Sequence, residues 1–421
     1  MARIQQQHVA SLTEDLWAKV FWHLEEMLEA EYQPEDSQAS MHRLNLVCKQ
    51  FRQAFVSHAG VVRQRILLSH SFSHKLLPSL LAWLDKKQSS VRALVSRRQG
   101  PIVAVVLAQL QSPQPTINLV EVYGVSPALL TAFSNLERCE LRNNKGSDMN
   151  LEPLGGLPRL HHLGLRGQFK NLHHVTGLTR LECASNFPVS DGIISNVQEF
   201  ATTLQHLNLD RCVLLGVHAL GLSACTALTQ LVLISSSLTL DNGDIYFDPE
   251  LSLSPSNLGL LGQLHTLHVS SSEEEISSLS WISTLTSLRH LTVHIRSCNN
   301  SPARSASCLT NLTHLKIYAT SRLSDDEDPV LNIDAPWDRL QALQILSICD
   351  FRLQLGAGLG VGGLLQLPHL REMSLHGSTV GESDSECFAA LMYNFARLLP
   401  QVQVACSSGN LTGFFERLPV C

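Results

Sequence analysis

The 421-residue chain lacks the marks of a membrane protein or of a disulfide-stabilised secreted domain. No apolar run reaches the about 18 residues that a transmembrane helix needs. The first 25 residues include Glu14, Asp15 and Lys19 and contain no apolar core of a signal peptide. The 11 cysteines form no Cys-x-x-Cys pair, and their odd number leaves one over. We therefore expect a reduced protein of the cytoplasm or nucleus, with no membrane partner.

Catalytic and cofactor-binding motifs are also missing. The chain has no Gly-x-Ser-x-Gly, no His-Glu-x-x-His and no Cys–His nucleophile arrangement. A glycine-rich run at 356–363 does not fit the P-loop; its last six residues have the spacing Gly-x-Gly-x-x-Gly, but the run lies between two repeats, where we expect an outer turn. These absences predict a non-catalytic protein without metal or cofactor.

Charge and aromatic residues are sparse. Only 16% of the residues are charged, the net charge is −6, and 6% are aromatic. The segment 41–100 is basic, with Asp85 as its single acid. A basic segment suits an acidic protein partner or is simply a set of solvated helix faces, and without a nucleic-acid motif it does not predict nucleic-acid binding.

What the chain has in abundance is one phrase, Leu-x-x-Leu-x-x-Leu-x-Leu. Clear copies begin at Leu157, Leu261, Leu285 and Leu309, and the second leucine recurs at 136, 160, 178, 204, 228, 264, 288, 312, 343 and 370. Four of these steps are 24 residues. Phrase and period together resemble the leucine-rich-repeat family. The resemblance implies an α/β solenoid over residues 116–405, with a curved parallel sheet, an irregular or helical convex side, and a tail at 406–421.

Each repeat is expected to end in a polar ladder residue three positions after its last leucine. In the family this is usually Asn or Cys, whose side chain satisfies backbone groups of the turn. Here the position holds Asn144, Asn186 and Cys212, but serine or threonine elsewhere, as at Ser378. The ladder is degenerate. Residues 61–115 are expected to hold a helical linker and a degenerate first repeat at 91–95, and a further weak repeat is expected at 117–122.

The first sixty residues follow a different pattern. Residues 11–14 read Ser-Leu-Thr-Glu, a capping box, and apolar residues then recur every four positions from 12 to 24. A second predicted helix, from 41 to 55, is apolar on more than one side because Leu46 and Val47 lie off its stripe. In so small a unit this excess indicates that a partner covers part of it.

Residues 10–58, within a helical unit expected at 1–60, resemble an F-box. Residues 12–16 read Leu-Thr-Glu-Asp-Leu, Val-Phe follows at 20–21, and Val-Cys-Lys-Gln-Phe-Arg occupies 47–52. The departures from the family are Thr13 for proline, Asp15 for glutamate, Phe51 for tryptophan, and an acidic insert at 25–40. The resemblance implies docking onto a Skp-type adaptor of a cullin–RING ubiquitin ligase, with the repeats holding the protein to be ubiquitylated. The implied adaptor-binding residues are Leu12, Leu16, Val20, Leu24, Leu46, Val47 and Phe51.

The repeats also predict which side chains face outward from the sheet. Nine of them are candidates for target binding: Arg138, Arg142, His162, Arg166, Arg180, His206, His290, His314 and Tyr318. The arginines favour an acidic or phosphorylated segment. Because neighbouring strands lie about 4.8 Å apart, His290 is expected beside His314, and His294 beside Tyr318.

Three interpretations of the clustered histidines stay open. They are ordinary surface residues of a strand, which we prefer, a pH-responsive surface, or part of a metal site. For the whole chain, the leading hypothesis is the substrate receptor of a ubiquitin ligase. The alternative is a leucine-rich-repeat scaffold of the cytoskeleton or cilium, and a small-molecule sensor has little support.

Overall fold

The structure is a computed structural model. It describes residues 64–68, 77–87, 91–99, 101–110, 117–143, 147–184, 200, 202–210, 213–215, 222, 224–234, 237–239, 261–270, 280–295, 306–319, 330–332, 336–354, 363–380 and 385–406. The F-box-like segment with its seven predicted adaptor-binding residues lies outside the described residues. The chain forms two compact units, 1–163 and 164–421.

The first unit begins with four strands of the main sheet and two α-helices among its described residues. In chain order these are β1 (Gln64–Leu68), α5 (Leu77–Lys87), β2 (Val91–Gln99), α6 (Pro101–Leu110), β3 (Leu119–Tyr123) and β4 (Arg138–Asn143). Each strand pairs in parallel with the next. A parallel neighbour needs a crossover, and the helices supply two of them. Strand β1 lies in the segment that the sequence assigns to a linker, so the sheet begins before residue 116.

Helix α6 shows why this region escapes the repeat phrase. Its sequence, Pro-Ile-Val-Ala-Val-Val-Leu-Ala-Gln-Leu, is apolar almost all round, and Val103, Val106 and Leu107 are fully buried. It packs against α5 and β2. A helix that is apolar all round belongs in a core. Beyond it come η3 (Pro127–Leu130), β5 (Met149–Asn150) and η4 (Glu152–Gly156). Strand β6 (His162–Gly167) contains the boundary between the units.

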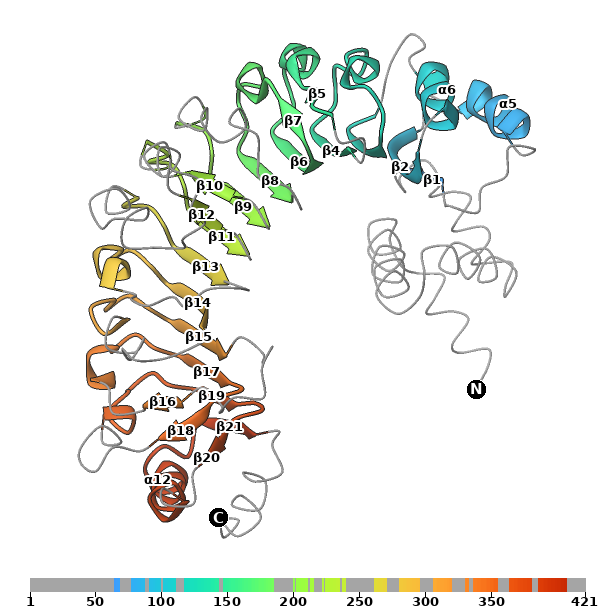
Figure 1. Cartoon of the computed structure of the whole chain (residues 1–421). Helices are drawn as coiled ribbons and strands as arrows, with labels where there is room; N and C mark the ends of the chain where they lie inside the picture. The colour runs from blue at the N-terminus through green and yellow to red at the C-terminus, as the bar shows by residue number, and fades with distance from the viewer. Residues whose placement is uncertain are drawn as a thin grey trace, which may run out of the picture. The chain divides into compact units, whose positions relative to one another are not determined.

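In the second unit the main strands pair in parallel in their order along the chain (Figure 1). They are β8 (Arg180–Ala184), β9 (His206–Asp210), β11 (Gln230–Ile234), β13 (Thr266–Ser270), β14 (His290–Ile295), β15 (His314–Ala319), β17 (Ile345–Cys349), β19 (Glu372–Leu375) and β21 (Gln403–Cys406).

Short elements occupy the other side of each repeat. The turns include η5 (Leu172–His174), η7 (Ser280–Thr284) and η8 (Trp337–Arg339), and β7 (Phe169–Lys170) lies ahead of η5. Strand β10 (Val213–Leu215) pairs with β12 (Ser237–Thr239), and β16 (Val330–Asn332), β18 (Arg352–Gln354) and β20 (Thr379–Val380) form a three-stranded sheet. This is the irregular side that the repeat pattern predicts.

The core follows directly from the leucine spacing. In register, Leu207, Leu231, Leu267, Leu291 and Leu315 lie side by side, and each is at most 2% exposed. Burying one such side chain contributes about 1.5–3 kcal/mol. A strand with one or two of these residues cannot enclose them alone, so each repeat depends on its neighbours.

The ladder position at Ser378 behaves as the family pattern implies. The Ser378 hydroxyl donates to the Ile348 carbonyl at 3.2 Å and accepts from the Phe351 amide at 3.4 Å, and the residue is fully buried. The neighbouring Gly377 has φ +62°, and a Cβ there would lie 2.0 Å from Asp350 Oδ1. The other ladder candidates named from the sequence, Asn144, Asn186 and Cys212, lie outside the described residues.

The end of the second unit matches its prediction. The sequence predicts a helix from 386 to 399 followed by a strand, and the structure has α12 (Ser385–Leu398) and β21. Helix α12 buries Phe388, Leu391 and Phe395, and it exposes Leu398. The helix connects β19 with β21, the last strand of the sheet, at the end of the second unit (Figure 1). No described helix has the length and apolar character that crossing a membrane takes.

Candidate protein-binding face

The outward residues of the second unit fall into three rows because the strands pair without a shift. Across β11, β13, β14, β15 and β17 the first row is Gln230, Thr266, His290, His314 and Ile345. The central row is Val232, His268, Thr292, Lys316 and Ser347. The third row is Ile234, Ser270, His294, Tyr318 and Cys349. We name the nine outward residues of β13, β14 and β15 the histidine face.

Aromatic rings meet across the strands of the histidine face. The His294 ring stacks on His268 with centroids 5.3 Å apart and on Tyr318 with centroids 4.6 Å apart. The His290 and His314 rings meet edge to face at 4.3 Å. Both contacts predicted from the repeat register, His290 with His314 and His294 with Tyr318, are confirmed.

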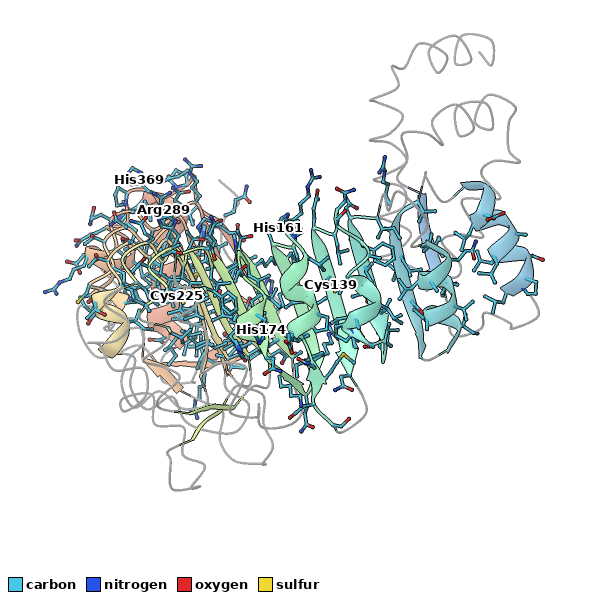
Figure 2. All side chains as sticks on the ribbon, turned by 90° about the horizontal axis from the view of Figure 1, so that it is seen from above. Cys139, His161, His174, Cys225, Arg289 and His369 are labelled. Carbon is cyan, nitrogen blue, oxygen red and sulfur yellow. The ribbon has the colours of Figure 1, made fainter. Side chains whose placement is uncertain are left out.

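Two threonines orient the first-row histidines. The Thr313 hydroxyl donates its proton to the Arg289 carbonyl at 2.9 Å and lies 2.8 Å from His314 Nδ1. With its proton committed, the hydroxyl oxygen accepts from Nδ1–H, so the basic nitrogen of neutral His314 is Nε2. The Thr266 hydroxyl lies 3.3 Å from His290 Nδ1. Arg289, just ahead of β14, lies at the same edge of the unit as His369 (Figure 2).

Every histidine of the face has a pKa below its ordinary value. Burial lowers the pKa of His268, and burial followed by the charge of His268 lowers that of His294. For His290 the causes are burial, then Arg289 and His265. For His314 burial, His290 and Lys316 lower the pKa, while Glu372 opposes them. The His268 Nε2 atom is shielded and has no hydrogen-bond partner among the described residues, which further disfavours the imidazolium.

Carboxylates are absent from the outward positions of these five strands. None of the three rows contains an Asp or Glu, and Lys316 is the single residue in them that is cationic at neutral pH. The acids that act on the face come from its borders. Glu372 acts on His314, and Asp350 raises the pKa of Tyr318 after burial and Cys349. Within these rows the face therefore carries one lysine and no carboxylate of its own.

The outward residues of β3 and β4, in the first unit, have the opposite character. Arg142 pairs with Glu121 at 3.2 Å and lies over the Tyr123 ring at 4.5 Å. Arg138 pairs with Glu140 on its own strand. On β8 of the second unit, Arg180 pairs with Glu182 at 2.7 Å. Three of the four arginines predicted to receive an acidic target therefore already have a carboxylate partner in this chain.

The remaining predicted residues are placed as follows. Arg166 is exposed and has no ion-pair partner among the described residues. His206 is half-buried in β9, in register between Arg180 and Gln230. His162 differs from the expectation of an outward, accessible ring because it is only 7% exposed. Strand alternation predicts the direction of a side chain, not how far its neighbours cover it.

Three residues of the histidine face are not among the nine predicted target-binding residues. His268 and His294 extend the ring stack, and Lys316 supplies the positive charge of the face. The alternation of inward and outward residues along each strand predicts that all three face outward. No group of three His, Cys, Asp or Glu converges as metal ligands within the part of the chain that the structure describes. His290 and His314 could supply two metal ligands, and a structural zinc site needs four.

Comparison with known proteins places this geometry in a fold class. An internalin (InlF) from Listeria monocytogenes is similar over 76% of this chain and 82% of its own, with 17% identity and a TM-score of 0.50. A leucine-rich-repeat protein from Leptospira interrogans matches 82% of this chain and 91% of its own, with 16% identity and a TM-score of 0.42. No protein-family model and no curated protein matches the sequence. At such identities the likeness concerns the fold alone. The chain has a leucine-rich-repeat solenoid fold.

Proposed function

We propose that this chain is the substrate-recognition subunit of an SCF-type ubiquitin ligase. In this proposal the F-box-like segment docks on a Skp-type adaptor, and the outward face of the repeats holds the target protein. A parallel sheet that presents three rows of side chains on neighbouring strands is a continuous surface for protein recognition. That surface is the observation that carries target binding.

The adaptor half of the proposal is supported by the order of the residues. The F-box-like phrases at 12–16, 20–21 and 47–52 stand in the family's order and precede a leucine-rich-repeat solenoid. The apolar excess at Leu46 and Val47 favours a docking module over a simple cap of the solenoid. A scaffold of the cytoskeleton or cilium would have no need of it.

Co-expression of the full chain with a Skp-type adaptor tests the proposal. We expect a complex that survives size-exclusion chromatography. The double variant Leu16→Asp, Val20→Asp should lose it, because each substitution places a carboxylate in the apolar stripe of the first predicted helix. A matched control, Gln33→Asp with Gln38→Asp, adds the same charge within the acidic insert and should leave the complex intact.

Circular dichroism of each variant reports whether the repeats remain folded. A wild-type chain that folds and captures no adaptor would reduce residues 10–58 to a cap and favour the scaffold. Equal loss in both double variants would show that added charge, not the apolar stripe, disrupts the complex.

A further inference from the structure

We propose that the histidine face binds an acidic segment of a partner protein and takes up protons when it does so. The segment presents Asp or Glu side chains to the His290–His314 pair and to Lys316. The inference rests on the proposed function in one respect, that the sheet face of the solenoid holds a protein target. It does not depend on the adaptor.

The first support is the lack of any counter-charge on the face. The outward positions of β11 and β17, which border the histidine face, are Gln230, Val232, Ile234, Ile345, Ser347 and Cys349, all without formal charge at neutral pH. Within the five strands β11 to β17, Lys316 therefore has no carboxylate in its own or the adjoining rows. Elsewhere in the second unit, Arg180 has Glu182 beside it. A carboxylate supplied by a partner is the group that this face lacks.

The second support is the geometry of the ring pair. His290 and His314 sit at opposed positions of adjacent strands, with ring centroids 4.3 Å apart. Protonation of both would place two positive charges side by side, a repulsion that an intervening anion relieves. Since Nδ1 of His314 is held by Thr313, its Nε2 is the atom available to a carboxylate.

The third support is the balance of charge around the pair. Arg289 and His265 act on His290 from the edge where the strands begin, and His290 and Lys316 act on His314. Glu372, on β19, is the acid that opposes them at His314. On the far side of the face, His268 acts on His294, and Asp350 and Cys349 act on Tyr318. Among the described residues, the two border carboxylates, Glu372 and Asp350, are fewer than the cationic and imidazole groups that act on the face.

Proton uptake follows from these surroundings. In the free protein the histidine pKa values lie below their ordinary value, so the rings are neutral at pH 7.5. A carboxylate placed beside a ring favours the imidazolium and raises its pKa. Binding then draws a proton onto the face, and by linkage the affinity rises as the pH falls toward the histidine pKa.

A peptide titration on the full chain tests the inference. The probe is a fluorescent ten-residue peptide of alternating Asp and Ser, compared with the same peptide carrying Asn for Asp, at constant ionic strength. We expect the Asp peptide to bind about tenfold more tightly at pH 6.0 than at pH 7.5, below the limit for one proton taken up per site. Calorimetry in two buffers of different ionisation enthalpy measures the proton uptake directly.

Three variants localise the effect. His290→Gln with His314→Gln should abolish most of the pH dependence, whereas Lys316→Gln should weaken binding at both pH values and keep the dependence. The control His174→Gln with His369→Gln removes two histidines of the second unit that lie outside the histidine face (Figure 2) and should behave as wild type. His290→Gln alone serves if the double variant lowers the melting temperature.

The inference is overturned if the Asp and Asn peptides bind equally, if affinity does not change with pH, or if the control variant loses as much as the His290, His314 variant. A phosphoserine peptide that binds while the Asp peptide does not would also overturn the choice of carboxylate. Adaptor capture is measured separately. If the chain fails to bind the adaptor but still binds the peptide, the ligase role is contradicted and this inference is not.

Discussion

Two regions of the molecule share a parallel-strand backbone but differ in the charge of their outward side chains. They are strands β3 and β4 of the first unit and strands β13 to β15 of the second. On β3 and β4, Arg142 and Arg138 each face a glutamate of the same chain. On β13 to β15 the outward residues include four histidines and a lysine without one acid. The comparison teaches that a repeat scaffold sets positions, while the outward residues decide whether a surface is internally balanced or open to an anionic partner.

The largest expected effect is on the free energy of unfolding, and it tests whether both regions depend on buried leucines. Leu141→Ala in β4 and Leu291→Ala in β14 each truncate an inward side chain; Leu141 is 1% exposed and Leu291 is 2% exposed. Each should lower the free energy of unfolding by about 2–5 kcal/mol, through lost burial and the cavity left behind. Chemical denaturation followed by circular dichroism measures it.

Thr292→Ala is the control for this comparison, since Thr292 occupies an outward position of β14. Its effect should stay within about 0.5 kcal/mol. A leucine variant as mild as this control would mean that its region does not depend on that buried leucine.

The next effect concerns the balanced region. Arg142→Ala removes an ion pair to Glu121, with both side chains about a quarter exposed, and a contact over the Tyr123 ring. We expect a loss of about 1–2 kcal/mol, more than an exposed pair contributes, because two partly shielded contacts are lost together. A double-mutant cycle with Glu121→Gln separates the ion pair from the ring contact. A coupling energy of zero would show that the pair adds nothing.

A smaller effect is expected in the open region when the pH changes. The pKa of His268 and of His294 is lowered in the folded protein, mainly by burial. At pH values below the ordinary histidine pKa the unfolded chain binds more protons than the folded one, so stability falls as the pH drops from about 6.5 through the folded-state pKa.

His268→Gln with His294→Gln should therefore lose less stability than wild type between pH 7.5 and pH 5.5. The difference in melting temperature is expected to be about 1–2 °C, since both rings are partly solvated. Thermal melts at the two pH values measure it. A variant that loses as much as wild type would remove the histidines from the account of pH dependence.

The smallest effect is expected at the exposed pairs. The side chains of Arg138 and Glu140 are 45% and 22% exposed, and those of Arg180 and Glu182 are 49% and 31% exposed. Arg138→Gln and Arg180→Gln should each change the unfolding free energy by less than about 0.5 kcal/mol. Denaturation at low and high salt checks this, and a larger change in either variant would mean that these pairs do more than balance charge.

Sequence patterns predicted much of the fold and part of the candidate site. The leucine period led to the parallel strands and to two ring contacts, because a repeat of constant length places equivalent residues opposite one another. It did not lead to β1 or α6, whose apolar runs carry no repeat phrase. The burial of His162 and the ion pairing of Arg138, Arg142 and Arg180 were also missed. Each depends on neighbours one strand away or on a rotamer, which strand parity does not specify.

The leucine-rich-repeat solenoid was determined by sequence alone, since a strand with inward leucines at a fixed period buries them only by stacking on its neighbours. So was the alignment of His290 with His314, because both stand at the same place in consecutive repeats of 24 residues. Only the tertiary structure decided which charges are already satisfied. Ion pairs and ring stacks form through side-chain geometry across strands, and that geometry leaves the arginines of β4 and β8 balanced and the histidine face without an acid of its own.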